Sequence, residues 1–136
     1  EGYFTAQAQS LSKPIEGLET VEIQMGTFDQ IPAKVQLDEL VKMIREKSGA
    51  EEFDRMVKSY LSEDIDALYQ IMNQDGMMKE YRGIMLDNRN KAWIPQLQEK
   101  MAKESLFVAV GSGHLAGEYG VISLLRKAGY QVEPVN

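Results

Sequence analysis

The spacing of apolar residues predicts that the middle of the chain, residues 36–101, is a helical lobe. Apolar side chains recur there at steps of three and four, which places them on one face of a helix. Ser48-Gly49 is expected to close the first helix, and Asp75-Gly76 to turn the chain before the last. Pro95 is expected either in a first turn or at a bend. The apolar positions of the successive helices are Leu37, Leu40, Val41 and Ile44; Phe53, Met56, Val57 and Tyr60; Ile65, Leu68, Ile71 and Met72; and Met78, Tyr81, Ile84 and Met85, continuing to Trp93, Leu97 and Met101.

The pattern changes near both ends of the chain. Leu106–Val110 is a continuous apolar run, as expected for a strand buried on both faces of a parallel sheet. A helix over residues 117–127 and a second short strand, Tyr130–Val135, are expected to follow. Near the other end, Ile15–Leu18 is expected to be a short strand before a helix capped by Glu19 or Thr20. The predicted fold class is therefore α/β: a helix-rich lobe plus a small, mainly parallel sheet that ends in a strand–loop–helix–strand unit over about 105–136.

Composition excludes several classes of site. The 136 residues include no cysteine, so a disulfide framework, a thiolate metal site and a cysteine nucleophile are all ruled out. A formal net charge of −6 opposes binding to a phosphate backbone, and we expect no nucleic-acid partner. The longest apolar run is too short to cross a bilayer, so no transmembrane segment is expected.

The loop that follows the predicted strand Leu106–Val110 is the place where chemistry is expected. In an open parallel sheet, ligands bind at the carboxyl ends of the strands, and Gly111, Ser112, Gly113 and His114 occupy such a position. His114 is the only histidine in the chain. It either contributes to a ligand or metal site, or caps the next helix while the glycines serve the turn. One histidine cannot form a catalytic metal site by itself, because such sites draw about three protein ligands.

Three segments resemble the TraB/GumN family in the same order along the chain. Phe107–Leu115, with Leu125–Val132 after it, looks like the closing signature of that family. Arg89–Trp93 resembles its arginine-asparagine-x-x-tryptophan segment, and Gly17–Thr20 resembles its glycine-leucine-glutamate-threonine segment. The family includes TIKI-type metalloproteases and is similar to the erythromycin-esterase and ChaN-like proteins. The resemblance identifies the chain as a single domain that forms the C-terminal part of such a protein.

The resemblance implies a metal site built from two glycine-x-x-histidine motifs and a glutamate. Residues 111–114 match the second motif, which makes His114 the expected ligand of a divalent metal: manganese, cobalt or zinc. No first motif occurs in the chain, so we expect the chain to be a fragment that is inactive without an N-terminal part. That part, or a second copy of the chain in a homo-oligomer, is the expected partner. Export to the periplasm or cell envelope is expected from the resemblance alone.

The other candidate site residues each have two interpretations. Glu19 either faces His114 as a catalytic carboxylate or is a helix N-terminal acid. Arg89 either acts in catalysis, on a substrate carboxylate or an oxyanion, or forms a structural salt bridge. Asn90 either belongs to a substrate-binding motif or ties backbone groups together. Glu118 is either part of the site or an exposed acid in the first turn of a helix.

Three interpretations of the function follow from this sequence. The first is a metal-dependent hydrolase of peptides or small molecules, with His114 as one ligand and the remaining ligands outside the chain. The alternative is a non-catalytic protein of the same fold that binds a peptide or a glycan. A third interpretation makes the helical lobe an interaction surface, which would then expose an apolar patch.

Overall fold

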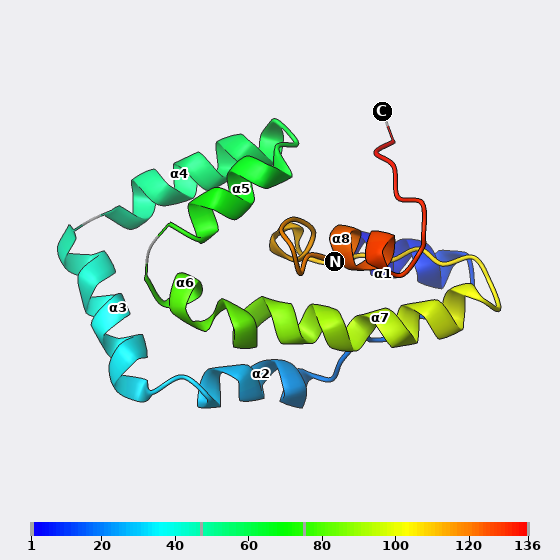
Figure 1. Cartoon of the computed structure of the whole chain (residues 1–136), viewed down its shortest axis with the longest axis horizontal. Coiled ribbons are helices and arrows are strands. Elements are labelled where there is room, and N and C mark those ends of the chain that lie inside the picture. The colour runs from blue at the N-terminus through cyan, green and yellow to red at the C-terminus, as the bar shows by residue number, and fades with distance from the viewer. Residues whose placement is uncertain (1, 47, 75, 136) are drawn as a thin grey trace.

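The computed structural model describes residues 2–46, 48–74 and 76–135, and every regular element within these ranges is helical (Figure 1). Within them, no helix is both long and apolar enough to cross a membrane. In chain order the elements are α1 (Gly2–Ser10), α2 (Val21–Asp29), α3 (Ala33–Glu46), α4 (Ser48–Leu61), α5 (Ile65–Met72), α6 (Gly76–Arg82), the π-helix η1 (Gly83–Asp87), α7 (Asn88–Met101), the 3-10 helix η2 (Ser112–His114) and α8 (Val121–Lys127).

The predicted α/β fold with a parallel sheet is wrong for the described residues. Ile15–Leu18, Leu106–Val110 and Tyr130–Val135 are irregular there and form no strand. A strand is stabilised by backbone hydrogen bonds to a neighbouring strand, and residues 106–110 make no such bond with any described residue. The expected burial on both faces fails as well, because the Phe107 side chain is 75% exposed.

The helices of the middle region are confirmed, with shifted ends. The first expected helix ends at Glu46, and Ser48-Gly49 begins α4 instead of closing α3. Asp75 lies outside the described residues, while Gly76 starts α6 with a positive φ of 74°. Pro95 lies inside α7, not in a first turn. The amphipathic stripe of α3 packs less than its pattern predicts, because Leu37, Leu40 and Ile44 are exposed.

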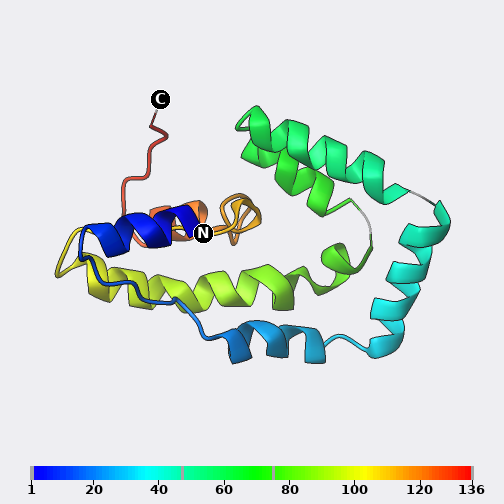
Figure 2. The same ribbon diagram turned by 180° about the vertical axis from the view of Figure 1, so that it is seen from behind.

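A single long helical stretch, made by α6, η1 and α7, supports the rest of the chain. Arg82 and Asn88, at the two ends of η1, both keep α-helical backbone angles, so the helical path is not interrupted. Figures 1 and 2 show α2 along one side of this stretch, with α8 and the preceding loop on the other. Segments from three parts of the sequence are thereby brought to the first turns of α7.

The main core lies between α7 and α8. Trp93, Ile94 and Leu97 of α7 pack with Val121 of α8. Partly buried apolar side chains surround this cluster: Leu18, Met101, Leu106, Val110, Leu124 and Leu125. The apolar run Leu106–Val110 therefore anchors its two end residues in the core even though it forms no strand.

Two glycines define α8, which begins at Val121 and is shorter than the expected helix over residues 117–127. Gly120 is the N-cap, with an extended ψ of 152°. At the other end Gly129 has a φ of +94°, and Gly129 N and Tyr130 N donate to the carbonyl oxygens of Arg126 and Leu125. This is a Schellman ending, which confirms the C-terminal cap predicted at Gly129. The loop that holds His114 is thus fixed between the end of α7 and a well-defined α8.

Candidate functional site

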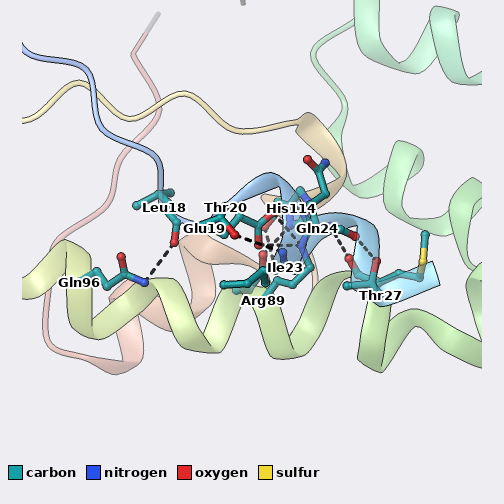
Figure 3. Close-up of polar contacts among 11 residues, drawn as sticks. Leu18, Glu19, Thr20, Ile23, Gln24, Thr27, Arg89, Gln96 and His114 are labelled. Carbon is teal, nitrogen blue, oxygen red and sulfur yellow. Dashed lines mark hydrogen bonds and ion pairs between the residues drawn. The ribbon is translucent and has the colours of Figure 1, made fainter. Parts of the chain in front are cut away.

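Glu19 and Arg89 form a largely buried ion pair at the start of α2 (Figure 3). Thr20 is the N-cap of α2, with its hydroxyl oxygen accepting from Ile23 N, and this cap places Glu19 just before the helix. Arg89 Nε lies 3.1 and 3.0 Å from the two Glu19 carboxylate oxygens, and Arg89 Nη2 donates to Oε1. The side chains are only 13% and 14% exposed. This is the most buried ion pair of the described residues, and its fork geometry is that of a strong charge-assisted contact.

Further contacts orient Arg89. Its Nη1 donates to the Met85 carbonyl oxygen at 2.8 Å, one turn back along the helix. The guanidinium carbon lies 5.5 Å from the centre of the Trp93 ring, which is one turn ahead. The Arg89 hydrogen bond holds the pKa of Glu19 below its usual value despite the opposing effect of burial, with smaller contributions from Trp93 and His114. Glu19 is therefore a carboxylate at neutral pH.

Asn90 joins α7 to the loop of His114. The Asn90 side chain is almost completely buried, at 1% exposure. Its Nδ2 donates to the carbonyl oxygens of Tyr119 at 2.8 Å and His114 at 3.3 Å. Its Oδ1 lies 2.6 Å from His114 Nδ1. One buried amide thus holds the imidazole and two backbone carbonyls of the loop in place.

His114 is held as a neutral imidazole. Burial is the main cause that lowers its pKa to about 4, and the positive charge of Arg89 adds to this, whereas Glu19 acts in the opposite direction. The Trp93 ring lies against it, with 4.6 Å between the ring centres. A neutral imidazole offers a nitrogen lone pair, which is the form that binds a metal ion or accepts a proton.

We expect the stability of the fold to fall as the pH drops from about 6.5 towards about 4, because of His114. Its pKa is lower in the folded chain, about 4 against the ordinary 6.5, so the unfolded chain takes up the proton first. The stabilisation is complete above 6.5 and is lost towards 4. Allowing for partial solvent exposure, the loss between about pH 7 and about pH 5 is roughly 1 kcal/mol.

Urea unfolding at these two pH values measures this loss. His114→Gln should flatten the pH dependence, because glutamine does not titrate. An unchanged slope in this variant would assign the effect to other groups.

The structure brings the main predicted site residues together from three segments. Glu19, Arg89, Asn90 and His114 form one connected cluster, which Figure 3 shows in part. Glu118 lies apart: its side chain is exposed and lies 3.5 Å from Lys127 Nζ. The remaining motif residues shape the loop: the carbonyl oxygens of Gly111 and Ser112 accept from the backbone amides of His114 and Leu115, and Gly113 lies against Met72.

Trp93 belongs to the cluster, but the sequence pattern placed it only on the apolar face of the last helix of the lobe and in the Arg89–Trp93 motif, not among the candidate site residues. It lies four residues after Arg89, so both side chains share one face of α7. That spacing is the signal that could have placed it in the site. Its indole nitrogen is buried and has no hydrogen-bond partner among the described residues. The indole still helps to lower the pKa of Glu19.

A hollow of about 260 Å³ lies beside the ion pair, between α2 and α7. Glu19, Arg89 and Trp93 are among the residues that line it. Its other walls are of mixed polarity: Leu18, Ile23, Thr27, Gln30, Ile84, Asn88, Ala92 and Gln96. The hollow is large enough for one amino-acid side chain or a small organic group.

The described residues do not by themselves form a complete metal site. No group of three or more histidine, aspartate or glutamate side chains within these ranges could hold an ion. His114 suits the role of one ligand, since it is neutral and only partly buried, but Glu19 is already engaged by Arg89. The metal role of His114 and the catalytic roles of Glu19 and Arg89 stay predictions.

Comparison with known proteins places the chain. No curated protein and no solved structure matches it. The model of the TraB/PrgY/gumN family matches residues 1–134, nearly the whole chain. This match covers all three segments that meet in the cluster of Glu19, Arg89, Asn90 and His114. The chain belongs to the TraB/PrgY/gumN family.

Proposed function

We propose that the chain contributes one half of the active site of a metal-dependent hydrolase, with His114 as its metal ligand. The other ligands, a second histidine and a carboxylate, come from outside the described residues, either from another segment of the protein or from a second copy. Peptides or small molecules with a scissile carbonyl are the proposed substrates. A divalent ion, manganese, cobalt or zinc, would lower the pKa of a bound water and polarise that carbonyl.

The observation that supports this proposal most is the convergence of three distant segments on one neutral histidine. Residues 19, 89–93 and 114 are far apart in the sequence, yet they lie in one cluster. A buried ion pair and a fully buried asparagine are costly to assemble unless every partner is satisfied. Such an arrangement around a neutral imidazole fits a site that must hold a ligand in a fixed direction.

Each residue of the chain has a distinct part in this proposal. His114 supplies a lone pair to the ion, and the carboxylate of Glu19 adds negative charge near it. Arg89 keeps Glu19 ionised and aligned through the fork contact. The hollow between α2 and α7 receives a side chain of the substrate next to this pair.

Calorimetric titration with Mn²⁺, Co²⁺ and Zn²⁺ tests the proposal. This chain alone should bind weakly, since its described residues hold no full ligand set, whereas the product of the whole gene should bind tightly. In the product of the whole gene, His114→Ala should weaken metal binding at least about 10-fold. Losing a residue that contacts the metal directly costs more affinity than losing an outer hydrogen bond. Glu118→Ala is the matched control, since Glu118 is exposed and close in sequence, and it should bind as the unaltered protein does.

A second candidate function is a non-catalytic protein that binds a peptide or glycan in the hollow beside Arg89. The incomplete ligand set within the described ranges favours this alternative. It predicts that neither this chain nor the product of the whole gene shows a heat of metal binding. It also predicts saturable binding of a peptide or glycan, which Arg89→Ala should weaken. Export to the cell envelope is compatible with both functions and stays a proposal.

A further inference from the structure

The neutral His114 has two possible tautomers, and its surroundings distinguish between them. His114 Nδ1 lies 2.6 Å from Asn90 Oδ1, and among the described residues this is the one hydrogen bond of the imidazole ring. Which ring nitrogen carries the proton therefore depends on what Asn90 presents to Nδ1. If an oxygen faces Nδ1, the proton must be on Nδ1; if an amide group faces it, the proton must be on Nε2.

The orientation of the Asn90 amide follows from its other contacts. One side-chain atom of Asn90 lies 2.8 Å from the Tyr119 carbonyl oxygen and 3.3 Å from the His114 carbonyl oxygen. Two carbonyl oxygens accept hydrogen bonds and cannot donate them, so the atom facing both must be the NH₂ nitrogen. The reversed amide would set an oxygen against two oxygens in a site that is almost free of solvent. The atom facing Nδ1 is therefore the amide oxygen.

We propose that Asn90 is a positioning residue that fixes His114 in the Nδ1–H tautomer and so leaves Nε2 as the only lone pair of the imidazole. A neutral histidine side chain in water favours the opposite tautomer, so Asn90 reverses an intrinsic preference. The functional meaning rests on the proposed metal role: Nε2 is then the nitrogen that binds the ion, supported by an outer hydrogen bond at Nδ1. The tautomer itself does not depend on that role.

Nitrogen-15 NMR of the imidazole tests the proposal directly. His114 is the only histidine of the chain, so its ring signals need no assignment by mutation. In metal-free protein at about pH 7, we expect a protonated Nδ1 and an unprotonated Nε2. The Nδ1 proton should show a nuclear Overhauser contact to the Asn90 side chain. A protonated Nε2, or an Nδ1 proton without that contact, would overturn the proposal.

A variant separates the role of Asn90 from that of its surroundings. In Asn90→Ala the ring should shift to a mainly Nε2-protonated form, while a folded variant that keeps the Nδ1–H tautomer contradicts the assignment. This buried side chain also holds the loop in place, so the variant can fail to fold. In that case the Overhauser contact between the Nδ1 proton and Asn90 in the unaltered protein decides whether the assignment holds. Absence of metal binding would refute the proposed function and leave the tautomer intact. Metal binding by a protein whose metal-free form has a protonated Nε2 would refute the tautomer assignment but not the proposed function.

Discussion

Replacing Gly120 with alanine should destabilise the chain by roughly 3 kcal/mol, the largest effect expected of a single methyl group here. A Cβ atom at Gly120 would overlap the backbone carbonyl oxygens of Leu115 and Ala116 and lie 2.6 Å from the Ala116 carbonyl carbon. Backbone atoms cannot move aside as the end of a flexible side chain can. The turn between η2 and α8 would have to open, which displaces His114 and the start of α8.

Chemical denaturation of this variant and of Gly26→Ala measures the effect. Gly26 lies in α2 with nothing within 4 Å of an added Cβ, so alanine there should stabilise the fold by about 0.5–1 kcal/mol. The two substitutions should change the free energy of unfolding in opposite directions. This distinguishes the close approach of backbone atoms at Gly120 from the general cost of a glycine in a fold. Equal, small effects at both positions would mean that the turn is not packed as described.

Replacing Arg89 with alanine should cost about 3 kcal/mol, because it leaves the Glu19 carboxylate without its partner in a mostly buried place. The exposed pair Lys103–Glu99 provides the contrast: Lys103→Ala should change the free energy of unfolding by less than about 0.5 kcal/mol. Urea denaturation at neutral pH measures both changes.

A double-mutant cycle isolates the interaction between Arg89 and Glu19. Removing both charged groups should cost less than the sum of the single changes, by about 1 kcal/mol or more, since no unpaired charge is then left. Additive effects would show that Arg89 and Glu19 do not stabilise the fold through their contact. Arg89 would then be available to bind a substrate.

The sequence predicted the helices well because their signals are local. Apolar steps of three and four located α3, α4, α5 and α7, and Gly129 marked the end of α8. The sheet failed because a strand depends on partners that no local pattern reveals. Residues 106–110 have the composition of a buried strand, but among the described residues nothing lies alongside to accept and donate their backbone hydrogen bonds.

The sequence predicted which residues form the candidate site better than it predicted how they contact one another. Matching segments identified Glu19, Arg89, Asn90 and His114, which the structure brings together. The bidentate contact between Arg89 and Glu19 and the threefold role of the Asn90 amide required coordinates, because each joins residues 24 or more positions apart. Their geometry favours the structural alternatives for Arg89 and Asn90, a salt bridge and a tie to backbone carbonyls, without testing catalysis.

Metal content is the most direct test of His114 as a ligand. The product of the whole gene, purified without chelators, should contain a divalent metal by elemental analysis. His114→Ala should lose that metal, and Glu118→Ala should retain it. Equal metal content in both variants, or none in the unaltered protein, would contradict the proposed metal-dependent hydrolase and leave binding without catalysis as the better account.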